Sequence, residues 1–94
     1  MASIGVLTLE LRLEDAHSLK DKRHVVKGLK DRLRARFNVA VAEIDFEDLW
    51  QRALLAAVTV SSSRENAEKV LQQVEEDAAG VLGGSLVGAA TEWL

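Results

Sequence analysis

Leucine occupies every second position from Leu7 to Leu13, and polar residues such as Thr8, Glu10 and Arg12 stand between the leucines. Side chains of an extended strand point alternately to the two faces of a sheet, so this period of two predicts a strand over 4–13 with one buried face. A layer of other elements must therefore cover the leucines. Charges interrupt every apolar run before the roughly 20 residues that a bilayer requires, so we expect no membrane segment.

Two helices are predicted on either side of the middle of the chain. Ser18 stands at an N-cap position before a helix whose apolar residues recur at helical spacing, and Asn38 is expected to end that helix. Ser62 and Glu65 form a capping box that opens a second helix. Three glycines, the first of them Gly80, are expected to lead the chain out of this helix.

Further strands are expected over 39–44, 53–61 and 86–94. The stretch over 53–61 is apolar on both faces, which is typical of a central strand. The element order is then βαββαβ, and right-handed crossovers place both helices on one face of a four-stranded antiparallel sheet. We therefore predict an α+β fold of the ferredoxin-like two-layer type. A chain of 94 residues supports one core, so residues 1–94 are expected to form a single domain.

The charge of the chain is concentrated in one segment. The net charge is −3, but eight of the twelve basic residues and only two of the fifteen acidic residues lie between Lys20 and Arg36. This segment carries +6, whereas the rest of the chain carries −9. A binding partner responds to a local field within about 10 Å at ordinary salt, so the segment matters more than the total.

Five of these cations step by three or four residues along the first predicted helix, so they form one stripe beside its apolar face. We predict that this stripe contacts nucleic-acid phosphates; its members are Lys20, Arg23, Lys27, Lys30 and Arg34. The remaining cations (Lys22, Arg32 and Arg36) are expected on the opposite flank. The alternative is an ordinary solvated helix face, because lysine and arginine commonly drape over the edge of a core.

No residue set typical of a catalytic centre is present. His17 and His24 have no serine or carboxylate at a recognised motif spacing, and no cysteine is available as a nucleophile or a zinc ligand. The acidic cluster beginning at Glu43 matches no calcium-loop pattern, so we expect a solvated loop. We therefore expect a protein that is not an enzyme and that has no metal or cofactor.

The face of the sheet opposite the helices is a second candidate surface. If Leu55 points away from the helices, it leaves an apolar patch there, and the two tryptophans, Trp50 and Trp93, are candidates to anchor an interface between two copies. Packing of the tryptophans in the core is the alternative. No aromatic residue lies on the third strand, so base stacking on the sheet is not expected.

Three stretches resemble one known family. Ser18 to Arg23 (SLKDKR), Phe37 to Glu43 (FNVAVAE) and Asp48 to Arg52 (DLWQR) are similar to the YlxP-like family of small uncharacterised bacterial proteins. The resemblance spans nearly the whole chain and implies the ferredoxin-like fold but no catalytic role. The family's genes tend to neighbour those of ribosome maturation and translation initiation, which by association favours an RNA or ribosome partner. Within these stretches, the positions of first interest are Ser18, Lys20, Lys22, Arg23, Glu43, Trp50 and Arg52.

Two functional hypotheses follow. The first is a non-catalytic RNA- or ribosome-associated protein that presents its basic helix to phosphates. The second is a homodimeric interaction or small-ligand-binding module that uses the open sheet face. The N-terminal region lacks the basic start and continuous apolar core of a signal peptide, and cysteine is absent, so we expect a cytoplasmic protein.

Overall fold

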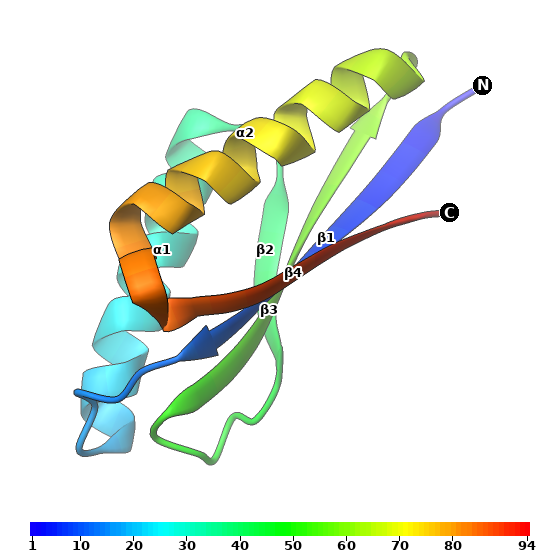
Figure 1. Cartoon of the computed structure of the whole chain (residues 1–94). Coiled ribbons are helices and arrows are strands. Elements are labelled where there is room, and N and C mark those ends of the chain that lie inside the picture. Colours follow the sequence, from blue (N-terminus) through cyan, green and yellow to red (C-terminus); the bar gives the residue numbers. More distant parts are fainter.

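Four strands and two helices follow one another in the predicted order. They are β1 (Ser3–Arg12), α1 (Leu19–Arg36), β2 (Ala40–Asp45), β3 (Arg52–Ser61), α2 (Arg64–Leu82) and β4 (Leu86–Trp93), with a 3-10 turn η1 (Gly83–Ser85) before β4. This computed structural model describes all 94 residues. The strands form one antiparallel sheet in the order β2-β3-β1-β4, and both helices lie on the same side of it (Figure 1). The ferredoxin-like fold is thus confirmed, with β3 in the interior of the sheet.

The core lies between the sheet and the helices. The leucines of β1 from Leu7 to Leu11 are fully buried, and Leu13 is nearly so. The helices contribute stripes at helical spacing, which include Leu29 from α1 and Val74 from α2. Burying a leucine side chain contributes roughly 1.5–3 kcal/mol, so the alternating leucines of β1 fix which face of the strand turns inward.

The prediction that Leu55 lies on the open face is wrong. Leu55 is 0% exposed and pairs in register with Leu9, so both side chains point toward the helices. Its neighbours Leu54 and Ala56 point to the open face and remain partly exposed. The strand is apolar on both faces and has no alternation of its own, so its orientation follows from pairing with β1.

The predicted helix ends agree with the structure at the start of α1 and at the end of α2, where Gly83 (φ 55°) is the C-cap, but not at the other two ends. Ser18 caps α1, because its Oγ accepts a hydrogen bond of 3.1 Å from the backbone N–H of Asp21. The helix then ends at Arg36 and Phe37 is extended (φ −134°), so Asn38 does not provide a left-handed end. The cap of α2 is Ser63 and not Ser62, since the Ser63 Oγ accepts the Asn66 N–H at 3.2 Å.

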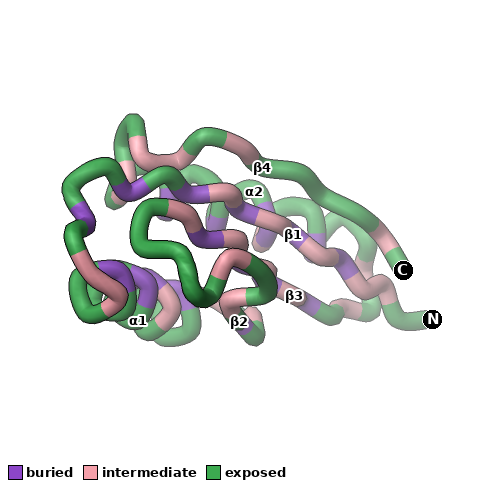
Figure 2. Tube along the Cα trace, turned by 90° about the horizontal axis from the view of Figure 1, so that it is seen from below, coloured by how far each residue is buried: buried purple, intermediate pink, exposed green.

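Trp93 lies on the helix side of the sheet, away from the open face. It is opposite Gly5 on β1, where an added Cβ would stand 2.7 Å from both the Trp93 ring and Leu71 of α2. Glycine therefore allows the indole to pack beneath α2, and the Arg64 guanidinium stacks over it at 4.0 Å from the ring centre. The prediction that Trp93 anchors an open-face interface is therefore wrong. Figure 2 shows that β4 itself is exposed along most of its length.

Candidate nucleic-acid interface

One of the eight cations of the basic segment is not at the surface. Lys22 is 1% exposed, and its Nζ lies 2.9 Å from the Glu43 carboxylate of β2. The same nitrogen donates hydrogen bonds to carbonyls of the loop between β2 and β3, the shortest being 2.7 Å to Phe46. The expectation that Lys22 belongs to a cationic flank of the helix is therefore wrong, because this lysine is a structural anchor.

Two more cations share one carboxylate of the second helix. Arg32 donates to both carboxylate oxygens of Asp77, at 2.8 and 3.1 Å, and Arg36 lies 3.6 Å from the same carboxylate. The hydrogen bond from Arg32 lowers the pKa of Asp77 below its ordinary value and raises the pKa of Arg32. These two arginines join α1 to α2, and Asp77 cancels one of their two charges.

The five cations of the predicted stripe remain at the surface. Lys20, Arg23 and Lys30 form no ion pair in this structure. The other two share one carboxylate, that of Asp31, which lies 2.6 Å from the Lys27 ammonium and 3.6 Å from Arg34. The stripe therefore keeps an excess of positive charge.

Four of the five stripe residues border a groove of about 360 Å³ between α1 and β2. The residues that line it are Arg23, Val26, Lys27, Lys30, Asp31, Arg34 and Glu43. Arg34 is fixed across this groove, since its Nη2 donates a 2.9 Å hydrogen bond to the Val41 carbonyl of β2. The groove thus brings together four of the five predicted residues, while Lys20 lies one turn of helix away toward the N-terminus.

Two carboxylates line this groove, those of Asp31 and Glu43. Glu43 is paired with the buried Lys22, whereas Asp31 pairs only with cations of the stripe. Its pKa lies below the ordinary value, mainly because Lys27 donates a hydrogen bond to it, with further attraction from Arg34 and Lys30. The aspartate is therefore ionised at neutral pH and cancels one of the five charges. Its side chain is about half exposed, so solvent weakens each of these pairings.

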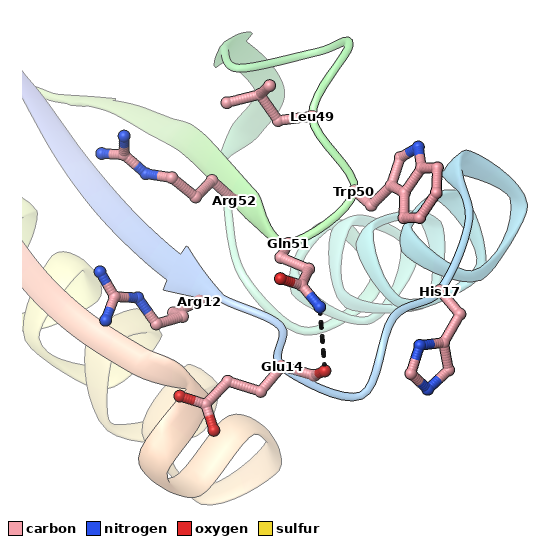
Figure 3. Close-up of a pocket in the computed structure, with 7 residues that line it drawn as sticks. All are labelled: Arg12, Glu14, His17, Leu49, Trp50, Gln51 and Arg52. Atoms are coloured by element: carbon pink, nitrogen blue, oxygen red, sulfur yellow. Dashed lines mark hydrogen bonds between the residues drawn. The ribbon is translucent and has the colours of Figure 1, made fainter.

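The β2–β3 loop presents Trp50 beside a shallow hollow of about 620 Å³ at one end of the sheet. Figure 3 shows Trp50 and His17 on one side of this hollow and the guanidinium groups of Arg12 and Arg52 on the other, with Gln51 between them. The indole is 52% exposed, and so it is free to stack on a planar group. It lies in the loop beyond the sheet and takes no part in the core.

The burial of Lys22 had a signal in the sequence. Lys22, Val26, Leu29 and Leu33 step by four, three and four residues, and these four are the buried residues of α1. The lysine thus continues the apolar stripe by one turn. A lysine is rarely buried unless its ammonium group is paired with acceptors or a carboxylate. Those partners come from a loop more than twenty residues away in the sequence, which the helical pattern alone does not identify.

No three histidine or acidic side chains are gathered in a way that could hold a metal ion. Of the acidic cluster, Glu43 turns inward to Lys22, and Asp45 accepts a 2.8 Å hydrogen bond from the N–H of Phe46. Neither helix is long and apolar enough to cross a membrane.

A comparison with protein families matches residues 4–89 to the family described as Protein of unknown function (DUF503). The chain belongs to this family. A relative is the Uncharacterized protein YlxP of Bacillus subtilis (strain 168), which is 45% identical over 71 residues, covering 76% of this chain and 77% of the relative. The family assignment agrees with the resemblance of the three sequence stretches and brings no assigned activity.

Solved structures with the same fold differ greatly in sequence. The de novo designed protein Foldit4 matches with a TM-score of 0.58 at 12% identity, covering 98% of this chain and 97% of the design. A second designed protein with a ferredoxin fold gives 0.51 at 16% identity, covering 100% and 84%. A dimeric ferredoxin-like protein of unknown function from Thermobifida fusca gives 0.51 at 14% identity, covering 97% and 90%. At these identities the likeness concerns the fold alone.

Proposed function

We propose that this protein is a non-catalytic binding module that contacts the phosphates of RNA, free or in a ribosomal particle. The observation that carries the proposal is the surplus of cations on one side of α1. Three of them (Lys20, Arg23 and Lys30) form no ion pair, and Lys27 and Arg34 share the single carboxylate of Asp31. The whole chain is anionic at −3, so this side of the helix is the surface on which a polyanion is least repelled.

The geometry of the stripe suits a phosphate backbone better than a small anion. Its residues follow one another along about four turns of helix, or roughly 20 Å, which spans several successive phosphates of a nucleic-acid strand. No deeply buried donor converges on one point, as a site for a single phosphate requires. Contacts of this kind position a nucleic acid without reading its bases, so we expect recognition of RNA shape and charge.

An RNA partner in translation would place the protein in the cytoplasm, and a chain without cysteine suits that reducing compartment. The groove between α1 and β2 offers cations and two carboxylates but no nucleophile beside a base, and for this reason the proposal is a binding function.

The test is a titration of a structured RNA at several salt concentrations. We expect the logarithm of affinity to fall linearly with the logarithm of salt, with a slope near −0.7 to −0.9 per contacted phosphate. Lys30→Glu should weaken binding severalfold and reduce the steepness of the slope by about 1. Lys69→Glu on α2 is the matched control, because it reverses the same charge on an exposed helix and should leave the affinity nearly unchanged.

Binding that is absent at low salt, or equal losses for Lys30→Glu and Lys69→Glu, would overturn the proposal. A second arm asks whether the RNA is ribosomal. The protein should sediment with ribosomal particles from a lysate, and the double variant Lys27→Glu/Lys30→Glu should remain in the supernatant. Nuclease treatment should release the wild-type protein as well.

Self-association through the open sheet face is a second candidate property. The side chains of β1 and β3 that point away from the helices are mostly apolar and partly exposed, among them Val6, Leu54 and Val58. A contiguous exposed apolar patch often marks an interaction surface. The Thermobifida fusca protein of the same fold is described as dimeric, which supports this property by analogy. Sedimentation of the wild-type chain over a range of concentrations tests whether a dimer forms.

A further inference from the structure

The open sheet face carries an apolar centre that no element of the chain covers. Cross-strand pairing places one set of side chains on this face, and all of them are partly or fully exposed. Its uncharged members are Ile4, Val6 and Thr8 on β1, Leu54, Ala56, Val58 and Val60 on β3, Ala40 and Ala42 on β2, and Ala90 on β4, and its charged members are Glu10, Arg12, Arg52 and Glu92. Val60 is 54% exposed, and it continues the patch toward the end of β3.

The area of this face suits a second protein better than a small ligand. Four strands about 4.8 Å apart, the longest with ten residues rising about 3.3 Å each, present roughly 500–600 Å² of flat surface. Side chains roughen this surface, so its accessible area approaches the about 800 Å² per partner of a standard interface. The largest hollow, of about 620 Å³, lies beyond the apolar centre, at the end of the sheet beside the β2–β3 loop, and none of the apolar residues named above lines it.

Two charges of opposite sign stand at opposite ends of the apolar centre. Arg12 ends β1 and is opposite Arg52 of β3, whereas Glu92 of β4 is opposite Val6 of β1. Both side chains belong to the open face, both are exposed, and neither forms an ion pair. Arg12 and Val6 are six positions apart on β1, which corresponds to about 20 Å along the strand.

We infer that a second copy of this chain docks on the open face with its strands antiparallel to those of the first, so that Arg12 of each copy faces Glu92 of the other. This inference rests on the self-association proposed above. A two-fold axis perpendicular to the strands and lying between the sheets generates this arrangement, and a two-fold interface is self-complementary. The apolar centre of one copy then covers that of the other, and both unpaired charges gain a partner.

The opposite orientation is disfavoured by charge. If the strands of the two copies ran in the same direction, Arg12 and Arg52 of one copy would meet the same two residues of the second. The Arg52 guanidinium is already paired with Glu10 at 3.0 Å, but Arg12 has no such compensation. Like charges brought together in an interface suppress that arrangement, so electrostatics selects the antiparallel one.

Charge reversal tests the arrangement. Arg12→Glu and Glu92→Arg are made in separate chains, and sedimentation equilibrium measures the dimer of each variant and of their equimolar mixture. Each variant alone places like charges opposite one another, so we expect its dimer to be at least tenfold weaker than that of the wild type. In the mixture every reversed charge faces the opposite sign, and the mixed dimer should recover an affinity close to the wild-type value.

Two controls accompany this experiment. Lys69→Glu and Glu75→Arg reverse the same charges at exposed positions of α2, which lies on the other side of the sheet from the open face, and should leave the dimer unchanged. Far-ultraviolet circular dichroism of every variant should match the wild type, because Arg12 and Glu92 are exposed and lie outside the core.

The outcomes separate the arrangement from the self-association on which it rests. A wild-type chain that stays monomeric at all concentrations overturns both, and leaves the face to another partner or ligand. A wild-type dimer that neither reversal weakens overturns the antiparallel arrangement and retains self-association. Weakening of each variant without recovery in the mixture also overturns the pairing of Arg12 with Glu92.

Discussion

The Nζ of Lys22 lies 2.9 Å from Glu43 Oε2, yet this buried oxygen accepts no hydrogen bond. The ammonium group donates instead to three backbone carbonyls, those of Phe46, Glu47 and Arg52, at 2.7, 3.1 and 3.3 Å. An ammonium has three N–H donors, so the β2–β3 loop and the first residue of β3 use all of them, and Glu43 contributes only its charge. The lysine thus fastens the first turn of α1 to both ends of this loop.

Removing the lysine should destabilise the protein more than removing the charge of its acidic partner. Lys22→Met leaves the three carbonyls and the carboxylate without a partner, and we expect a loss of about 3 kcal/mol in the free energy of unfolding. Glu43→Gln keeps the three hydrogen bonds, and the Glu43 side chain is 17% exposed, so we expect a loss of about 1 kcal/mol. Urea unfolding of both variants measures the difference. Equal losses, or the reverse order, would contradict this role of Lys22.

Adjacent leucines of β3 should respond in opposite ways to aspartate. Leu55→Asp introduces an unpaired carboxylate into a fully buried site, and its cost of several kcal/mol is comparable with the total stability of a small domain. Leu54→Asp places the same charge on the open face, where water reaches it, so the fold should persist while any dimer weakens. Circular dichroism should report an unfolded Leu55→Asp chain and a folded Leu54→Asp chain. Two folded variants, or two unfolded ones, would refute the assignment of these faces.

The Asp77 pair predicts how stability depends on acid pH. Because the hydrogen bond from Arg32 lowers the folded-state pKa of Asp77 below the ordinary value of 3.8, the pair stabilises the fold fully above that value. This stability is lost as pH falls through the lowered folded-state pKa. The melting temperature of the wild type should therefore exceed that of Asp77→Asn at neutral pH and approach it below about pH 3.8. Parallel curves at all pH values would show that Asp77 contributes nothing through its charge.

The sequence predicted the fold because its main signals are local. The alternating leucines of β1 specify a strand and its buried face, and Ser18 with Asp21 specifies where α1 begins. The face of β3 was not predictable in this way, because a run that is apolar on both sides reads equally well in either orientation. Pairing of Leu9 with Leu55, which are 46 positions apart, decides the matter.

The sequence predicted which cations of α1 lie together, but not which of them are paired with carboxylates. Helical spacing places Lys20, Arg23, Lys27, Lys30 and Arg34 together, and the structure keeps them at the surface. The carboxylate that Arg32 and Arg36 share is that of Asp77, which lies 45 residues after Arg32 and on another helix. Such a pair depends on how α1 and α2 pack together, and no periodicity within either helix reveals it.

The two tryptophans give the molecule separate optical reporters. Trp93 is wedged between Gly5 and α2 under a guanidinium group, whereas Trp50 stands in water on a loop held by an internal ammonium. In a variant that retains only Trp93, tryptophan fluorescence reports whether α2 is packed on the sheet. In a variant that retains only Trp50, it reports the conformation of the β2–β3 loop. Undocking of the second helix and loosening of the loop can therefore be watched independently in the same small protein.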